Sequence, residues 1–328
     1  MSVLRPIDLL GRRLSTLRIS VTDRCNLRCQ YCMPAELLGR EVAFLPRDQI
    51  LSFEELTRVS AAFVLLGVGK LRVTGGEPLL RRDLPLLVSL LRGLGEHLDL
   101  AITTNGTGLD RLAPSLREAG LNRVTVSLDA LDATVGSRMA GRPVDPGRTW
   151  AALLKARDLG LAIKVNSVIR RDINDDQVLL LASRCREEGI PLRFIEYMDV
   201  GNSNGWLREQ VVTGDAIRMR ISACWRLEPV TEPLASSTAR RFRYVDGAGE
   251  VGFINSITEP FCRGCDRARV SAEGTLYTCL FAGQGVSLKK WLRTEKVGVA
   301  ELADRLADVW VHRRDRYSEE RAGGDGVG

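Results

Sequence analysis

The sequence predicts an α/β fold, in which six consecutive βα units form a partial (βα)6 barrel and a smaller C-terminal extension contains a β-hairpin. Strand-like and helix-like segments alternate through the first two-thirds of the 328 residues, an order typical of a parallel sheet covered by helices. Near residues 201–205 the alternation gives way to a hairpin pattern. With 45% hydrophobic residues, the chain is able to bury a large core.

The predicted elements of the barrel are short strands, each followed by an amphipathic helix. Ser52 and Glu55 have the spacing of a capping box before the first helix, and Gly120 stands at the expected C-terminal cap of the third. The strands are predicted over residues 17–22, 70–74, 100–104, 122–128, 161–169 and 191–198. The helices are predicted over residues 53–66, 83–94, 109–119, 146–159 and 175–188.

The remainder of the chain is predicted to form a smaller domain. Residues 239–245 and 250–257 alternate as a hairpin does, and a further strand is predicted over 275–280. Two short helices are predicted over 287–293 and 299–311. We therefore expect a barrel domain over residues 8–215, a C-terminal domain over 216–320 and a flexible tail over 321–328.

Composition narrows the class of protein. The net charge of +6 suits a polyanionic partner, either nucleic acid or a nucleotide, although mild basicity alone selects neither. The only histidines, His97 and His312, argue against histidine-based catalysis and multi-histidine metal sites. The N-terminus lacks the apolar core of a signal peptide, and no apolar run has the length of a membrane span. We expect a cytoplasmic protein with reduced thiols.

Three cysteines lie close together near the N-terminus, at Cys25, Cys29 and Cys32, with the spacing C-x3-C-x2-C. Thiolates suit iron–sulfur clusters, zinc or copper(I). Structural zinc sites usually close with four ligands, so three thiolates favour a cube-shaped cluster with one open iron. A zinc knuckle that lacks a ligand, or three thiols in a core, are the alternatives.

A second group comprises Cys262, Cys265 and Cys279, spaced C-x2-C-x13-C. A second cluster with an open iron is favoured once the first is accepted. Zinc is a competitor, since C-x2-C is a common zinc half-site, with His312, Asp266 or a carboxylate from elsewhere in the chain as the fourth ligand. Arg263, Arg267 and Arg269 surround the group and suit contacts with phosphate, although a solvated basic loop is the plainer interpretation. The isolated Cys185 and Cys224 are predicted to be buried structural cysteines.

In barrels of this type the chemistry lies at the carboxyl ends of the strands. The first cysteine loop follows the first predicted strand, and the turn at residues 75–78 (Gly-Gly-Glu-Pro) follows the second. Lys164 is a lone charge in an apolar strand, in a chain with only six lysines. This scarcity favours an inward-facing functional lysine over a solvent-facing charge on an edge strand.

The first cysteine motif, with an aromatic residue before its last cysteine, resembles the signature of radical S-adenosylmethionine (SAM) enzymes. The turn at residues 75–78 resembles their second motif. Residues 258–269, Cys279, residues 193–198 and residues 315–318 are similar to the GTP 3′,8-cyclase family of molybdenum cofactor biosynthesis. The resemblance covers residues 8–320 and implies a partial TIM-type barrel with a C-terminal iron–sulfur extension. It departs at Gly323-Gly324, which come earlier than the family's terminal glycine pair, so the tail receives no role.

The resemblance implies two [4Fe–4S] clusters, the first on Cys25, Cys29 and Cys32 and the second on Cys262, Cys265 and Cys279. SAM completes the first cluster and yields a 5′-deoxyadenosyl radical. That radical abstracts H3′ of GTP, and the product is 3′,8-cyclo-7,8-dihydro-GTP. The implied SAM-binding residues are Tyr31, Gly76, Ser127 and Met198. The implied GTP-binding residues are Arg18, Arg72, Thr103, Lys164, Arg267, Ala268 and Arg269, of which Arg267 and Arg269 are also catalytic.

The implied partners are GTP, an electron donor of the flavodoxin or ferredoxin type, and the cyclic pyranopterin monophosphate synthase that takes up the product. Nucleic acid and membrane are not expected as partners, and a homodimer is left open. One alternative is a radical SAM enzyme that modifies peptides, since many of these carry an auxiliary cluster. A second is a non-enzymatic iron–sulfur regulator that binds nucleic acid.

Overall fold

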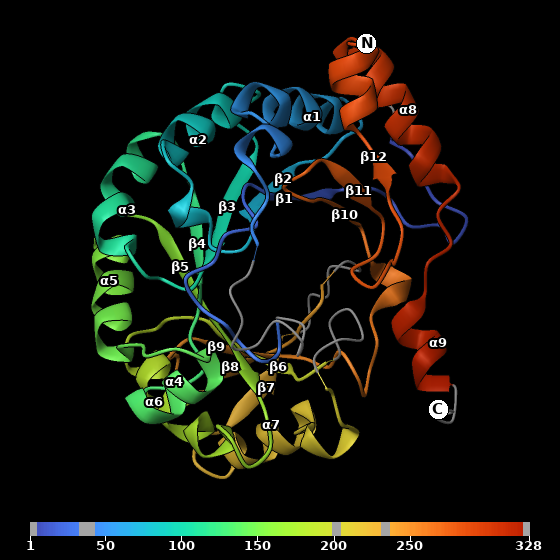
Figure 1. Cartoon of the computed structure of the whole chain (residues 1–328). Coiled ribbons are helices and arrows are strands. Elements are labelled where there is room, and N and C mark those ends of the chain that lie inside the picture. Colours follow the sequence, from blue (N-terminus) through green and yellow to red (C-terminus); the bar gives the residue numbers. More distant parts are fainter. Residues whose placement is uncertain (1–4, 33–42, 199–204, 231–236, 324–328) are drawn as a thin grey trace.

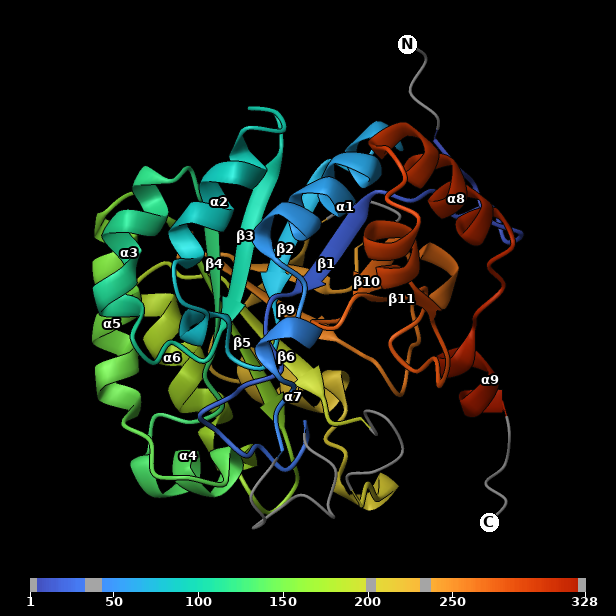
Figure 2. The same cartoon turned by 45° about the horizontal axis from the view of Figure 1, so that its top comes forward.

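One sheet of twelve strands runs through the part of the chain that the structure, a computed structural model, describes: residues 5–32, 43–198, 205–230 and 237–323 (Figure 1). The strand order is β12-β11-β10-β1-β2-β3-β4-β5-β6-β9-β8-β7. Strands β10 through β9 in this order pair in parallel, and the pairs at both ends are antiparallel. Figure 2 shows neighbouring arrows pointing toward one edge of the sheet.

The strands of the barrel are β1 (Thr16–Ser20), β2 (Lys70–Thr74), β3 (Asp99–Thr104), β4 (Arg123–Ser127), β5 (Ala162–Ile169) and β6 (Leu192–Glu196). The later strands are β7 (Leu227–Pro229), β8 (Arg240–Tyr244), β9 (Glu250–Ile254), β10 (Arg267–Val270), β11 (Thr275–Tyr277) and β12 (Val286–Ser287). The predicted hairpin is confirmed as β8 and β9, which pair antiparallel.

The helices cover the outside of the curved sheet (Figure 1). They are α1 (Phe53–Leu65), α2 (Leu84–Arg92), α3 (Leu109–Glu118), α4 (Ala133–Ala140), α5 (Pro146–Asp158), α6 (Val178–Glu187), α7 (Gly214–Ser222), α8 (Val299–Val311) and α9 (Tyr317–Gly323). Helix α8 packs on α1, which brings the C-terminal part of the chain back beside the first helix (Figures 1 and 2). No helix among the described residues has both the length and the apolarity needed to cross a membrane.

Alternation along each strand separates the core from the inner face of the sheet. In β1, Leu17 and Ile19 are fully buried among the core residues, whereas Arg18 between them points the other way, since neighbouring side chains alternate. The capping box that starts α1 is confirmed: Ser52 Oγ accepts from the Glu55 amide, and Ser52 N donates to Glu55 Oε2 at 2.8 Å. Gly120 ends α3 at φ +93°, as predicted.

The C-terminal extension continues the barrel sheet at two places. Strand β10 pairs in parallel with β1, and β9 pairs in parallel with β6. The extension therefore places its own strands on either side of the six βα units. The sheet crosses the predicted boundary near residue 215, so the division into 8–215, 216–320 and 321–328 stays a prediction.

Several predictions need correction or lie outside the described residues. Helices α4, α7 and α9 and strands β7, β10 and β12 were missing from the predicted elements. The first short C-terminal helix is a π-helix at Lys290–Thr294. Cys185 is buried as predicted, but the prediction for Cys224 is wrong: it lies in the turn just after α7 and is exposed. The predicted turn at 201–205 and the tail from 324 fall mostly or wholly outside the described residues.

Candidate active site at the carboxyl ends of the strands

The first cysteine loop begins directly after β1 and is held by the turn that follows β2. The Gly76 amide donates to the Thr22 carbonyl, and the Glu77 amide donates to the Arg24 carbonyl, each at 2.7 Å. A Cβ added at Gly76 would lie 2.3 Å from the Arg24 oxygen. The absence of a side chain therefore lets two backbones meet. A contact between Gly76 and SAM stays a prediction.

Glu77 is a buried carboxylate that joins the ends of three strands. Its Oε1 accepts from Thr104 Oγ1 at 2.6 Å and its Oε2 from the Asn105 amide at 2.8 Å. Asn105 Nδ2 in turn donates to Asn26 Oδ1, inside the cysteine loop, at 2.9 Å. Burial raises the pKa of Glu77, and these bonds oppose that rise. The loop is thus tied to β3 as well as β2.

Burial favours the neutral thiol form of the cysteines in this loop. Burial raises the pKa of Cys25 and of Cys29, and the charge of Asp129 raises the pKa of Cys29 further. Such thiols become thiolates when a cation compensates the charge. Among the described residues, no three Cys, His, Asp or Glu side chains converge on one metal ion. A cube-shaped cluster needs no such convergence, because each thiolate binds a different iron.

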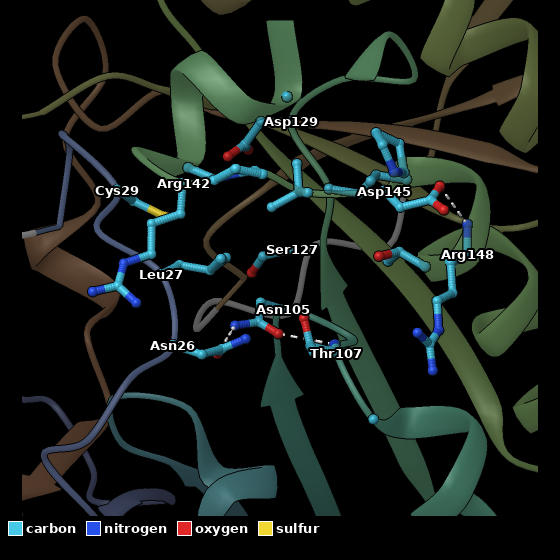
Figure 3. Close-up of a pocket in the computed structure, with 18 of the residues that line it drawn as sticks. Asn26, Leu27, Cys29, Asn105, Thr107, Ser127, Asp129, Arg142, Asp145 and Arg148 are labelled. Carbon is cyan, nitrogen blue, oxygen red and sulfur yellow. Dashed lines mark hydrogen bonds between the residues drawn. The ribbon is translucent and has the colours of Figure 1, made fainter. Parts of the chain in front are cut away.

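A pocket of about 730 Å³ opens beside Cys29 (Figure 3). Ser127, at the end of β4, lines it together with Asn26, Tyr31 and Asp129. The Tyr31 hydroxyl donates to Asp129 Oδ2 at 2.7 Å. Burial raises the pKa of Asp129 to about 6, against the hydrogen bonds from Tyr31 and the Val168 amide. Two of the predicted SAM residues, Tyr31 and Ser127, therefore share this pocket with a predicted cluster ligand.

The second group of cysteines lines a separate cavity of about 170 Å³, to which all three predicted ligands contribute. Arg12 and Arg313, which the sequence analysis did not identify, support it. Arg313 donates to the Cys265 carbonyl at 2.6 Å and to Cys265 Sγ at 3.2 Å. Arg12 donates to the Cys262 carbonyl at 3.0 Å. Both arginines are buried and contact Asp8.

These arginines change the chemistry of one thiol. Burial would raise the pKa of Cys265, but the charges of Arg267 and Arg313 outweigh it and bring the pKa down to about 7. Of the candidates for a fourth zinc ligand, the carboxylate of Asp315 lines the cavity with the cysteines, whereas Asp266 and His312 have other partners. Asp266 accepts from the Ser15 and Thr16 hydroxyls at the start of β1. His312 is 73% exposed, and its Nδ1 lies 2.8 Å from the Asp308 carbonyl.

Three predicted GTP residues stand in one line across the inner face of the sheet. Arg18 is directly opposite Arg269 on β10 and directly opposite Arg72 on β2. Like charges in such positions repel each other. Burial lowers the pKa of all three guanidinium groups, that of Arg72 and Arg269 to about 10, and repulsion between the arginines adds to it. We call Arg18, Arg72, Lys164, Arg267 and Arg269 the cationic row.

Lys164 completes this row from β5. Burial, together with the charges of Arg193, Arg123 and Arg72, lowers its pKa to about 7. Nε of Arg18 and Nε of Arg267 are buried without a hydrogen-bond partner. Buried donors of positive charge with no acceptor are costly. The row therefore favours a bound polyanion.

Of the other predicted site residues, some lie beside the cationic row and others line the two pockets. Thr103 accepts from Arg72 at 3.4 Å. Ala268 is fully buried on the core side of β10, so only its backbone faces the site. Met198 follows β6 and lines the cavity of the second cysteines, whereas Ser127 lines the pocket beside Cys29. Cys32 is the most exposed of the predicted ligands.

Known proteins resemble this chain over most of its length. The model of the radical SAM superfamily matches residues 19–185, and the model described as Molybdenum Cofactor Synthesis C matches residues 190–319. A GTP 3′,8-cyclase of Acidothermus cellulolyticus is 51% identical over 319 residues, covering 96% of this chain and 88% of the relative. A GTP 3′,8-cyclase of Staphylococcus aureus is 41% identical over 315 residues, covering 96% and 92%.

Solved structures share the fold. SuiB of Streptococcus suis, bound to S-adenosylmethionine, has a TM-score of 0.61 at 16% identity, covering 94% of this chain and 68% of SuiB. anSMEcpe with bound AdoMet has a TM-score of 0.57 at 16% identity, covering 86% and 78%. The predicted partial barrel with a C-terminal extension is thereby confirmed. With the extensive identity to the two cyclases, the chain belongs to the GTP 3′,8-cyclase family of the radical SAM superfamily.

Proposed function

We propose that this chain converts GTP to 3′,8-cyclo-7,8-dihydro-GTP with SAM, the first step of molybdenum cofactor biosynthesis. The observation that carries the proposal is the cationic row, which lies beside the second cysteines and in which Nε of Arg18 and Nε of Arg267 have no hydrogen-bond acceptor. Relatives at 51% and 41% identity are GTP 3′,8-cyclases. This favours a nucleotide substrate over the alternatives of a peptide-modifying enzyme and a nucleic-acid-binding regulator.

The proposed ligands are Cys25, Cys29 and Cys32 for a [4Fe–4S] cluster that binds SAM, and Cys262, Cys265 and Cys279 for a second cluster near the guanine. When bound, the first cluster and SAM would supply the radical chemistry for removal of H3′ of GTP. Tyr31, Gly76, Ser127 and Met198 are proposed to hold SAM. The chain itself positions both reactants and excludes water.

The cationic row is proposed to bind the triphosphate. Arg18 and Arg267 have buried Nε atoms that would then gain acceptors, while Arg72 is oriented by hydroxyls on β3 and β4. Arg267 lies 3.5 Å from Cys265 Sγ and stacks on Phe261 at 4.9 Å. Arg267 and Arg269 are thus proposed to stabilise negative charge as the closing electron and proton reach the cyclised nucleotide.

Anaerobic reconstitution with iron and sulfide, followed by incubation with SAM, dithionite and GTP, tests the proposal. Formation of 5′-deoxyadenosine should depend on GTP and be accompanied by a cyclised nucleotide. Equal 5′-deoxyadenosine with and without GTP, and no cyclised product, would contradict it. ATP in place of GTP is the matched control, because it carries the same triphosphate and lacks the guanine.

GTP affinity is expected to fall as pH rises above about 7, because Lys164 loses its proton in the free protein near that pH. A bound triphosphate raises the pKa of Lys164, so binding takes up a proton. Between the free and bound pKa values, Kd rises by up to about tenfold per pH unit. Calorimetric titration with GTP from about pH 7 to 9, without SAM, measures the slope.

Lys164→Gln should bind GTP more weakly at pH 7 and lose this slope. Lys164→Arg should bind tightly with little slope, because a guanidinium keeps its charge across the range. The triphosphate itself is almost fully ionised above pH 7.5, so it contributes little to the slope. Equal slopes for the parent and Lys164→Gln would assign the proton to another group.

We propose that an acidic electron donor of the flavodoxin or ferredoxin type docks beside the first cysteine loop. A concave surface there is lined by Arg24, which precedes Cys25, and by Arg47, Arg81 and Arg82. Burial and the charge of Arg47 lower the pKa of Arg81, so these two arginines repel each other on this surface. Asp48, Glu54 and Asp83 also line it. Transfer of the product to the cyclic pyranopterin monophosphate synthase completes the proposal.

Arg47→Glu is expected to slow turnover several-fold with a reduced acidic donor protein, because rim charges steer association. The effect should shrink at high salt. Turnover with dithionite, a small reductant, should be unchanged. Arg117→Glu reverses an exposed charge on α3, away from this surface, and serves as the control. Equal loss with both reductants would show damage to the site and not to docking.

A further inference from the structure

The chain after α4 makes backbone contact with the first cysteine loop. The Arg28 amide donates to the Ala140 carbonyl, the last residue of α4, at 2.8 Å. Gly141 follows at φ +62°, a conformation that L side chains rarely adopt. A Cβ built on Gly141 would lie 2.2 Å from the Arg28 carbonyl oxygen and 3.0 Å from its carbon. Backbone, not a flexible side chain, fills the space.

The point of contact is one peptide from a predicted cluster ligand. The Arg28 carbonyl belongs to the peptide that carries the amide of Cys29. The Arg28 side chain folds back over the loop and donates to the carbonyls of Cys25 and Leu27, each at 2.8 Å. A shift of Arg28 would therefore move the chain on both sides of it. Arg142, next to Gly141, lines the same pocket as Cys29 (Figure 3).

The loop is fixed elsewhere by the turn at Gly76, by side-chain bonds from Asn105 to Asn26 and from Arg170 to Gln30, and by the bond from Tyr31 to Asp129. Those supports act before and after Arg28. The Arg28 amide itself is held by α4. Helix α4 is anchored in turn, since Gln177 Oε1 accepts from the amides of Leu131 and Asp132, directly before the helix. The helix offers a fixed end against which the middle of the loop rests.

We propose that Gly141 is a positioning residue for the SAM-binding cluster: because it lacks a side chain, the end of α4 can press on the Arg28 peptide and set the place of Cys29. The proposal rests on the proposed cluster at Cys25, Cys29 and Cys32. Gly141 touches neither SAM nor iron in this account. It acts through the backbone of Arg28, as an outer-shell group does at a metal site.

Gly141→Ala tests the proposal, with Gly189→Ala as the matched control. Gly189 has the same φ of +62°, but a Cβ there would meet nothing within 4 Å. Both variants carry the same backbone strain, and only the first displaces Arg28. Iron per chain after reconstitution, the electron paramagnetic resonance spectrum of the reduced protein with and without SAM, and SAM affinity by equilibrium dialysis are the measurements.

Gly141→Ala is expected to bind SAM about 10- to 100-fold more weakly, or to lose iron and the SAM-induced change in the spectrum. GTP affinity should match that of the parent, because the cationic row lies on β1, β2, β5 and β10 and not on α4 or the first cysteine loop. Gly189→Ala should match the parent in iron and SAM affinity. Both variants should show similar small losses in the unfolding temperature of the iron-free protein.

Equal iron and SAM affinity in Gly141→Ala and Gly189→Ala would overturn the inference and leave the proposed function intact. A parent protein that binds no SAM-responsive cluster would instead overturn the proposed function. If Gly141→Ala fails to fold, Gly141→Asn replaces it, because asparagine accepts this φ yet still carries the Cβ. If both fail while Gly189→Ala folds, Gly141 serves folding and the inference is wrong.

Discussion

Cys29→Ser is expected to reduce both SAM cleavage and GTP cyclisation to background. Serine keeps the size of the side chain but offers a hard, weakly acidic oxygen in place of a thiolate, so a [4Fe–4S] cluster loses one of its three ligands. Anaerobic reconstitution followed by quantification of 5′-deoxyadenosine measures the loss. Iron should fall by about half, since the second group keeps its own cluster. The unfolding temperature of the iron-free protein should stay close to that of the parent, because Cys29 is not part of the core.

Cys262→Ser makes the corresponding substitution in the second group of cysteines. It should also remove about half of the iron, yet SAM should still bind and the SAM-induced spectrum should persist. Cys224→Ser, which changes an exposed cysteine outside both groups, should leave iron and activity unchanged. Unchanged iron in Cys262→Ser, together with bound zinc in the parent, would favour zinc at the second group. Retained SAM cleavage in Cys29→Ser would contradict the assignment of the first.

Arg269→Met is expected to stabilise the free protein and damage the enzyme. Arg269 lies in line with Arg18, and burial together with repulsion from Arg267 and Arg313 lowers its pKa to about 10. Methionine of similar length removes the buried charge and fills the space, so the free energy of unfolding should rise by about 1–3 kcal/mol. Loss of one phosphate-binding cation from a closed site should lower kcat/KM for GTP by roughly 10²- to 10³-fold.

Denaturant unfolding of the iron-free protein and steady-state kinetics of the reconstituted protein measure the two effects. Arg263→Met is the control, because its side chain is 91% exposed and belongs to the same cysteine segment. It should change stability and kcat/KM little. A destabilised Arg269→Met would show that this guanidinium has a structural partner that outweighs the repulsion. Unchanged kinetics would remove Arg269 from the proposed site.

Local sequence patterns predicted the strands and helices that are specified by residues within a few positions of one another. All six βα strands and six of the helices lie where their periodicity placed them, because apolar alternation and caps act within a few residues. Strand β10 was missed, since a four-residue segment with two arginines becomes a strand only by pairing with β1. Helix α4 was missed although Asp132 and Gly141 mark its two ends, a cap signal that a closer search would have found.

The residues of the candidate site likewise divide into those that a local pattern identified and those that it could not. Spacing identified both cysteine groups, and the structure puts Arg18, Arg72 and Arg269 in one line, which no local pattern could reveal. The supports of Cys265 were not predicted. Arg12 reaches Cys262 across 250 positions of sequence, and Arg313 reaches Asp8 across 305. Such contacts form only when the fold brings the two ends of the chain together, so no local pattern predicts them.

The pairing of β1 with β10 has a consequence for how the protein is made. Ser15, at the start of β1, contacts Asp266 across 251 positions of sequence. During synthesis, β1 and the first cysteine loop leave the ribosome early, but one edge of β1 stays unpaired until nearly the whole chain has followed. Long-range parallel pairing is slow, and an open edge invites pairing with other chains. Shielding of that edge by chaperones, and cluster insertion only after chain completion, would suit a nascent chain with this topology.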